Sequence, residues 1–160
     1  MIVACPPRTR WYVWDGKSAT VMSICVDASL VVRLIADPTD ARVTVLWETW
    51  ERDGQLLLAP TLLFYEVANA LYRYQRAGHL NADAVALALD AALALPIQLH
   101  DDAALHREAL ALAGRLGLPA AYDAHYLALA ARFGATFWTA DARIVNTVTP
   151  ALHWVRLLPY

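Results

Sequence analysis

The chain has 160 residues, of which 59% are hydrophobic and 18% are charged, and its formal net charge is −2. This length fits one domain with a proper core, and the charge excludes binding of a polyanion through a global basic field. An enzyme that brings phosphate to an acidic site through bound cations is not excluded. No apolar run approaches the roughly 18 residues of a membrane-spanning helix, so we expect no membrane association.

The N-terminal region differs from the rest of the chain. Residues 1–21 hold two prolines, three basic residues and two of the tryptophans, without a clear apolar period. Met22 stands directly before the first apolar segment. We therefore expect an N-terminal arm, or an extension from an early start codon, at residues 1–21, followed by one domain at residues 22–160.

The two cysteines, Cys5 and Cys25, are too few and too poorly placed for a disulfide framework or a metal motif. Free thiols are typical of a reducing compartment. The sequence therefore predicts a cytoplasmic protein.

From residue 24 onward, short apolar runs alternate with longer amphipathic segments. The short runs predict strands at residues 24–26, 56–59, 96–100, 135–138 and 153–158. Apolar residues at helical spacing predict helices at residues 28–35, from about 39 to 54, 60–77, 81–95, 101–116, 120–133 and from about 141. Strands separated by helices predict a three-layer α/β/α fold with a mainly parallel central sheet.

Polar and glycine residues mark several predicted helix ends. Ser29 is placed to cap the helix at residues 28–35, and the tripeptide Asp37-Pro38-Thr39 to end that helix and cap the next one. Gly78 is placed to stop the helix at residues 60–77.

Asp27 directly follows the first predicted strand. In open α/β sheets, ligands bind outside the carboxyl ends of the strands, so Asp27 stands where such folds place their chemistry. A strand-end aspartate can equally serve as a helix cap, and Asp27 alone does not decide between the two interpretations.

Three further acids lie on apolar elements. Glu66 is within the apolar helix LLFYEVANALYRY, Asp123 is in the first turn of AAYDAHYLALAARF, and Asp141 follows the fourth strand. Like charges about 4 Å apart repel by roughly 4 kcal/mol at an effective dielectric near 20, so clustered carboxylates need cations or raised pKa values. The hard ions Mg²⁺ and Mn²⁺ are the natural partners of such oxygen ligands.

The segments that carry these acids resemble a known family. VDAS at residues 26–29, YEVANAL at 65–71, AAYDAHYLALA at 120–130 and TADARI at 139–144 are similar, in order and separation, to the four acidic motifs of PIN-domain proteins. Within that family the chain is most similar to the VapC-like toxins of bacterial toxin–antitoxin pairs. Each motif is weakly specific alone, whereas the four in register are strongly specific, and they cover about residues 22–160.

The resemblance implies a Mg²⁺- or Mn²⁺-dependent endoribonuclease whose metal-binding and catalytic acids are Asp27, Glu66, Asp123 and Asp141. Asp27 and Asp123 would hold the principal ion, Asp141 would complete or adjust its ligand sphere, and Glu66 would orient or deprotonate the attacking water. It also implies two partners, an RNA substrate and a cognate antitoxin.

Three polar residues could support these acids. Asn69 and Thr139 match polar positions that the family places near the second and fourth acids. Arg73 lies seven residues after Glu66, on the same helix face, and could contact phosphate. A solvated surface charge is the simpler interpretation of each arginine, including the weaker candidates Arg33, Arg76 and Arg143.

The apolar helices at residues 60–77 and 82–95 supply more hydrophobic surface than one small sheet needs. We expect them to form a homodimer or to bind the antitoxin. A PIN-like interaction module without catalysis is the alternative function, although the presence of all four acids favours an enzyme.

Two other classes of α/β protein with acids at strand ends are each excluded by a single residue. A phospho-receiver domain needs a lysine late in the chain, but the sole lysine is Lys17. A phosphatase of the haloacid-dehalogenase type has a second aspartate two residues after the first, where this chain has Ser29. No glycine-rich loop indicates nucleotide binding.

We interpret the histidines, and the aromatic residues near the acids, as structural residues without a role in the chemistry. The histidines share no ligand spacing such as HExxH; they are residues 79, 100, 106, 125 and 153. Tyr65, Tyr122 and Trp138 could stack on a base, but we expect all three to pack in the core.

Overall fold

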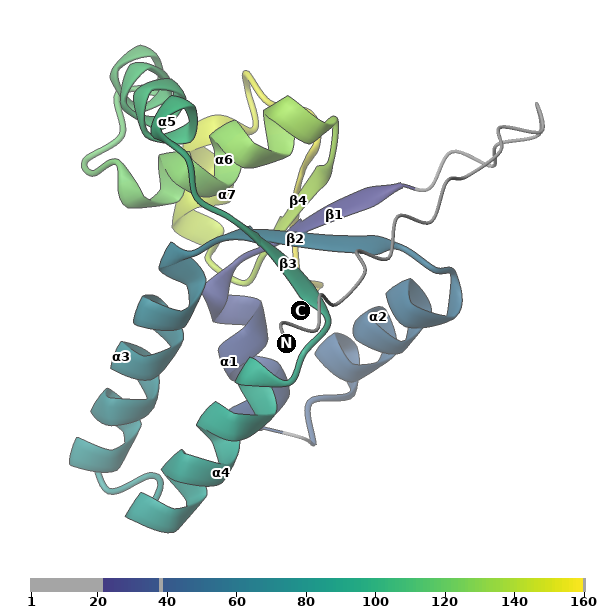
Figure 1. Cartoon of the computed structure of the whole chain (residues 1–160), viewed down its shortest axis with the longest axis vertical. Coiled ribbons are helices and arrows are strands. Elements are labelled where there is room, and N and C mark those ends of the chain that lie inside the picture. The colour runs from purple at the N-terminus through teal and green to yellow at the C-terminus, as the bar shows by residue number, and fades with distance from the viewer. Residues whose placement is uncertain (1–21, 38, 160) are drawn as a thin grey trace, which may run out of the picture.

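The computed structural model describes residues 22–37 and 39–159, and the arm predicted at residues 1–21 lies outside this part of the chain. Within the described residues, five strands alternate with seven helices (Figure 1). The strands are β1 (Ser23–Val26), β2 (Leu56–Pro60), β3 (Ile97–His100), β4 (Thr136–Thr139) and β5 (Val155–Leu157). The helices are α1 (Ala28–Ala36), α2 (Ala41–Arg52), α3 (Leu62–Arg76), α4 (Ala82–Leu93), α5 (Ala103–Leu116), α6 (Tyr122–Phe133) and α7 (Ala142–Val148).

The strands form one sheet in the order β3-β2-β1-β4-β5, and all four pairings are parallel. Helices α1 to α4 lie on one side of this sheet and α5 to α7 on the other (Figure 1). The predicted three-layer α/β/α fold with a mainly parallel sheet is therefore confirmed. The chain adds β2 and β3 on one side of β1, then β4 and β5 on the other, so the order reverses between β1 and β4. In open α/β sheets this switch point is the usual position of a binding crevice.

The central strand is buried on both faces. Ile24, Cys25 and Val26 are at most 3% exposed, as expected for a parallel strand covered by helices on both sides. Burial raises the pKa of the free Cys25 thiol, so this cysteine is a packing residue, whereas Cys5 lies outside the described residues.

Helix α6 is apolar around nearly its whole circumference. Ala124 and residues 126–130 are buried, because α6 packs on β1, β2 and β4 on one side and on α5 on the other. The first turn of α6 and its last three residues reach the surface, and the first turn carries Asp123. Burial of the rest of the helix thus fixes the position of this acid.

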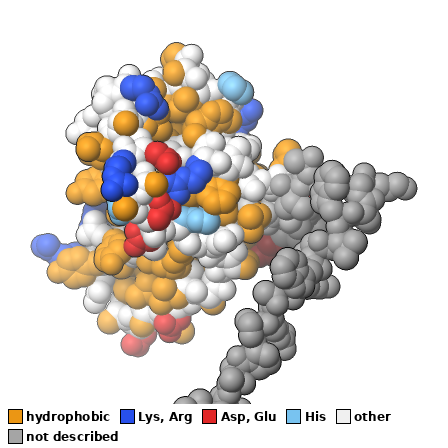
Figure 2. All heavy atoms as spheres, turned by 45° about the horizontal axis from the view of Figure 1, so that its top comes forward, with side chains coloured by type: hydrophobic (Ala, Val, Ile, Leu, Met, Phe, Trp, Pro, Cys, Tyr) orange, Lys and Arg blue, Asp and Glu red, His pale blue; other side chains and the backbone are white. Residues whose placement is uncertain are grey.

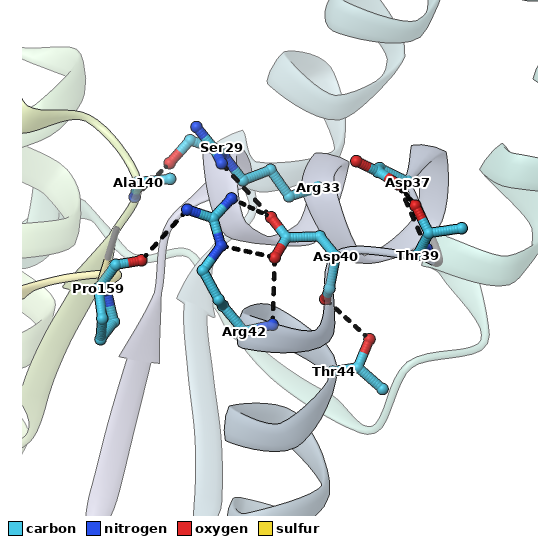
Figure 3. Close-up of polar contacts among 9 residues, drawn as sticks. All are labelled: Ser29, Arg33, Asp37, Thr39, Asp40, Arg42, Thr44, Ala140 and Pro159. Atoms are coloured by element: carbon cyan, nitrogen blue, oxygen red, sulfur yellow. Dashed lines mark hydrogen bonds and ion pairs between the residues drawn. The ribbon is translucent and has the colours of Figure 1, made fainter.

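The start of α2 differs in detail from the prediction. Asp37 ends α1 as predicted, but the cap of α2 is Asp40, which directly precedes the first helical residue and accepts a hydrogen bond from the backbone N–H of Arg42 (3.1 Å). The hydroxyl of Thr39 instead donates to Asp37 (2.6 Å). The Asp40 carboxylate also binds the guanidinium groups of Arg42 (2.7 Å) and Arg33 (3.5 Å), as Figure 3 shows.

The surface carries no field of a single sign on the face shown in Figure 2. Acidic and basic side chains lie close together there and alternate with hydrophobic ones. This distribution agrees with the small net charge. Among the helices of the described residues, none combines the length and the apolar character needed to cross a membrane.

Candidate active site

An open pocket of about 560 Å³ lies at the switch point of the sheet. Its lining includes the residues that follow β1 and β4, together with side chains from α1, α3, α6 and α7. All four predicted acids line it, and so do two of the predicted supporting residues: Asp27, Glu66, Asp123, Asp141, Asn69 and Arg73. Side chains separated by more than 110 residues in the sequence therefore meet in one cavity.

Asp27 continues β1 into the pocket. Its backbone is extended (φ −86°, ψ 153°), and its N–H donates to the carbonyl of Trp138 at the end of β4 (3.1 Å). One carboxylate oxygen, Oδ2, accepts hydrogen bonds from the hydroxyls of Ser29 (2.5 Å) and Thr139 (2.6 Å). Burial raises the pKa of Asp27, and the two hydroxyl donors oppose this increase. The carboxylate is therefore held in one orientation in a poorly solvated position.

The two hydroxyls also connect the ends of β1 and β4. Thr139 is fully buried and accepts a hydrogen bond from the backbone N–H of Asp141 (2.9 Å). Ser29 accepts from the backbone N–H of Ala140 (2.9 Å; Figure 3). The prediction that Ser29 caps α1 is wrong, because the N-cap is Asp27 and Ser29 lies inside the first turn. Its hydroxyl points to the neighbouring strand end instead.

Glu66 projects from α3 at the edge of that helix's buried face. Leu63, Val67 and Leu71 form this face, and Glu66 directly precedes Val67. Burial, and next the charges of Asp27 and Asp123, raise the pKa of Glu66 to about 7 against the opposing effect of a hydrogen bond. That bond comes from a residue that the sequence analysis missed.

The donor is the hydroxyl of Tyr126, which lies 2.5 Å from Oε2 of Glu66. Tyr126 is 1% exposed and sits on α6, three residues after Asp123. This spacing places Tyr126 and Asp123 on the same helix face, and it is the signal that could have identified the tyrosine.

Asp123 and Asp141 differ in their electrostatic surroundings. Burial raises the pKa of Asp123, and the charges of Asp27 and Asp141 raise it further. Asp141 caps α7 and is bound by the backbone N–H (2.8 Å) and the guanidinium group (2.6 Å) of Arg143, which lower its pKa. Three of the four acids thus have raised pKa values, mainly because the pocket buries them; for Glu66 and Asp123 the charges of neighbouring carboxylates add to this effect.

Three arginines line the pocket. Arg143 is paired with Asp141, and Arg33 lies 3.5 Å from Asp40. Among the residues that the structure describes, Arg73 is the lining arginine without a carboxylate partner. The weaker candidate Arg76 does not line the pocket.

The expected core packing of three aromatic residues is correct for one of them. Trp138 packs against Trp50, with ring centroids 5.8 Å apart. Tyr65 is 76% exposed and Tyr122 is 62% exposed, so the core prediction is wrong for both tyrosines. Tyr65 lies on the opposite side of α3 from the buried face, and Tyr122 occupies the exposed first turn of α6. Tyr74 lines the pocket and was not predicted.

The pocket offers oxygen ligands for a cation. In residues 22–37 and 39–159, no three His, Cys, Asp or Glu side chains are grouped closely enough to hold a metal ion. Mg²⁺ does not require such a group, since it keeps several waters and is commonly bound by one or two carboxylates plus substrate phosphates. Asp27 and Asp123, whose charges disfavour each other, fit this mode of binding.

The domain is a three-layer α/β/α domain, with a parallel sheet covered on both faces and an acidic pocket at its switch point. The PIN domain family profile matches residues 24–148, so the chain belongs to the PIN domain family. The resemblance found in the four acidic motifs is thereby confirmed.

Individual relatives agree with this assignment. Ribonuclease VapC3 from Pyrobaculum aerophilum is 31% identical over 133 residues, which cover 82% of this chain and 98% of the relative. The crystal structure of PAE2754 from Pyrobaculum aerophilum has a TM-score of 0.62 and 25% identity, over 84% of this chain and 91% of that one. VapC20 from Mycobacterium tuberculosis, a toxin that cleaves the sarcin-ricin loop, has a TM-score of 0.57 and 19% identity, over 83% and 98%, and this match concerns the fold alone. The chain is therefore similar to VapC-like PIN proteins, as predicted.

Proposed function

We propose that the chain is a metal-dependent endoribonuclease that hydrolyses RNA phosphodiester bonds at its four-carboxylate pocket, as the toxin of a toxin–antitoxin pair. The observation that carries this proposal is the convergence of Asp27, Glu66, Asp123 and Asp141, from four separate segments, on one open pocket. The similarity to ribonuclease VapC3 supports the same class of activity.

Asp27 and Asp123 would hold a Mg²⁺ or Mn²⁺ ion, and Asp141 would complete or adjust its ligand sphere. When bound, the ion would stabilise negative charge on the phosphate oxygens and make nearby water more acidic. The hydroxyls of Ser29 and Thr139 both donate to Oδ2 of Asp27 and fix the orientation of its carboxylate. Oδ1 is the oxygen that would then bind the ion. Arg143 keeps Asp141 ionised in the apo protein.

Glu66 is suited to accept a proton from the attacking water. A general base works best when its pKa is near the working pH, and the pKa of Glu66 is about 7. The hydrogen bond from Tyr126 leaves Oε1 as the oxygen directed to water. Tyr126 is therefore a positioning residue for this base.

Residues of α3 would contact the RNA backbone next to Glu66. Asn69 and Arg73 follow Glu66 by three and seven residues, so the three side chains lie on one helix face, and all line the pocket. The guanidinium group of Arg73 would bind a phosphate beside the scissile one. The open form of the pocket suits a single strand or a loop, whose backbone can enter it.

The test is cleavage of a single-stranded RNA by purified protein with Mg²⁺, with Mn²⁺ and with EDTA. We expect cleavage with either metal and none in EDTA. Glu66→Gln should lose at least 100-fold in rate, the lower end of the usual effect of removing a general base, and Asp27→Asn, which removes a metal ligand, should lose a comparable amount. Asp90→Asn removes an exposed carboxylate of α4 and serves as the matched control. Cleavage in EDTA by Glu66→Gln would refute the metal mechanism. Metal binding without cleavage would favour the non-catalytic interaction module.

We also propose that the exposed apolar side chains of α3 and α4 bind the antitoxin or a second copy of the chain. Leu87 is 71% exposed and Leu93 is 54% exposed on α4, and Tyr72 is 56% exposed on α3. Light scattering of Leu87→Lys should show a lower mass than wild type, alone or with the antitoxin. Leu110→Lys is the control, since Leu110 is equally exposed (69%) but lies on α5, across the sheet. A monomer that no antitoxin binds would contradict this proposal.

Two smaller proposals complete the function. The nuclease domain comprises residues 22–160, and the enzyme acts in the cytoplasm, where RNA and antitoxin are available. Protein that begins at Met22 should melt and cleave like the full chain. A large decrease in its melting temperature would show instead that residues 1–21 belong to the folded domain.

A further inference from the structure

Two histidines from different helices meet outside the acidic pocket. Nδ1 of His106 on α5 lies 3.0 Å from Nε2 of His125 on α6, with ring centroids 5.2 Å apart and ring planes inclined by 70°. The side chain of His106 is 61% exposed, so the contact is open to solvent. Histidine side chains reach the surface on the face shown in Figure 2. Neither histidine lines the acidic pocket.

The outward nitrogen of each ring faces an oxygen that can only accept a hydrogen bond. Nδ1 of His125 lies 2.7 Å from the backbone carbonyl oxygen of Ala121. Nε2 of His106 lies 3.3 Å from Oδ1 of Asp101. Both contacts favour a hydrogen on the outward nitrogen, and this fixes the tautomer of each neutral ring.

The inward nitrogens of the two neutral rings then present lone pairs to each other. Two lone pairs at 3.0 Å repel unless a positive centre lies between them, and either a proton or a metal ion can fill that role. Metal-bound histidines commonly donate the other ring N–H to a carboxylate or a backbone carbonyl, which orients the ring and raises its basicity. The contacts of Asp101 and Ala121 are of these two kinds.

We propose that His106 and His125 form a binding site for a borderline transition-metal ion of the Zn²⁺ or Cu²⁺ type, with Asp101 and the carbonyl of Ala121 as orienting partners. Two Zn–N bonds of 2.0 to 2.1 Å at a tetrahedral angle separate the nitrogens by about 3.3 Å. The observed separation is 3.0 Å, so the two nitrogens have to part by a few tenths of an ångström, and the exposed His106 ring has to turn so that both lone pairs point to the ion. Water completes the ligand shell.

The two-histidine site differs chemically from the acidic pocket. Imidazole nitrogens prefer Cu²⁺ and Zn²⁺, whereas carboxylate oxygens suit Mg²⁺ and Mn²⁺. An ion held by both rings would cross-link α5 to the first turn of α6, where His125 lies two residues after Asp123. Binding would therefore stabilise the helix end that carries this acid. The inference does not depend on the proposed ribonuclease activity, because it concerns metal binding and stability alone.

The test is calorimetric titration of the full-length protein with Zn²⁺ in a non-chelating buffer, with excess Mg²⁺ present to compete at the carboxylates. Wild type should bind one Zn²⁺ more than His106→Gln does, and its melting temperature should increase with Zn²⁺. Asp101→Asn should weaken the binding by about 10- to 100-fold, the usual effect of losing an orienting partner. His153→Ala removes another exposed histidine and should bind like wild type.

Electron paramagnetic resonance with Cu²⁺ provides a second readout that does not depend on stability. Wild type should show hyperfine coupling to two imidazole nitrogens, and His125→Asn should show coupling to one. Equal Zn²⁺ binding by wild type and His106→Gln would overturn the proposal. A proton alone between the rings would give the same negative result, with no Zn²⁺ bound at this site.

Discussion

Replacing Glu66 by glutamine should stabilise the metal-free protein in a pH-dependent way. The pKa of Glu66 is about 7 in the folded protein, against an ordinary value of 4.5. The folded state therefore binds the proton more tightly than the unfolded state does. The stabilisation that the Glu66 carboxyl group contributes to the folded state is fully present below pH 4.5 and is lost as the pH rises through 7. Glutamine cannot ionise, so the variant avoids this loss.

The magnitude follows from the two pKa values. Since each factor of ten in proton affinity corresponds to 1.36 kcal/mol, the ionised carboxylate costs about 3 kcal/mol of unfolding free energy above pH 7. Solvent in the open pocket screens this charge and reduces the cost to about 1 to 2 kcal/mol. For a domain of this size, Glu66→Gln should then raise the melting temperature by about 3 to 6 °C. The glutamine carbonyl can still accept the Tyr126 hydrogen bond, so that interaction is retained.

The assay is thermal unfolding followed by circular dichroism in EDTA, at about pH 5 and about pH 8. The advantage of Glu66→Gln should be present at the higher pH and nearly absent at the lower one. Glu48→Gln, at an exposed position of α2, is the control for removal of an ordinary glutamate charge. The reasoning is refuted if Glu66→Gln melts at or below the wild-type temperature at pH 8, or if its advantage is the same at both pH values.

Three further substitutions test other parts of the pocket. Asp123→Asn should melt no lower than wild type in EDTA and should lose most of the Mg²⁺ stabilisation, which for wild type is about 2.7 kcal/mol at 100 times the dissociation constant; an unchanged Mg²⁺ shift would remove Asp123 from the site. Thr139→Val deletes a buried hydroxyl donor to Asp27 and should cost about 1 to 3 kcal/mol in denaturant unfolding, with Thr139→Ser restoring most of it. Tyr126→Phe removes the bond that lowers the pKa of Glu66, so the acidic limb of the pH–cleavage profile should move to higher pH; an unmoved limb would show that another group is the base.

The fold could be predicted from the sequence because each element is locally consistent. Continuous apolar runs such as the one at Ile24 indicate a strand buried on both faces, and glycines with positive φ, such as Gly78 and Gly134, end the preceding helices. The carboxyl ends of parallel strands meet at one edge, so the meeting of Asp27 and Asp141 also followed from topology.

The sequence could not provide contacts that depend on how separate elements pack. Ser29 and Tyr126 each bind an acid of the pocket, although their own segments indicate only a cap and a core residue. Tyr65 has a large aromatic side chain of the kind that packs in cores, but it lies on the exposed side of its helix. His106 and His125 share no motif spacing, and only the packing of α5 on α6 brings them together.

The position of β4 beside β1 has a consequence for the order in which the protein forms. Ile24 pairs with Thr136, so the central strand stays an open edge until most of the chain has been synthesised. Pairings this distant in sequence form slowly, and unpaired strand edges promote aggregation in partly folded chains. A nascent chain that stops before Thr136 has neither Asp141 nor the hydroxyl of Thr139 that orients Asp27. An RNA-cleaving activity at this pocket would therefore be absent while the chain is being translated and would arise only when β4 and β5 have joined the sheet.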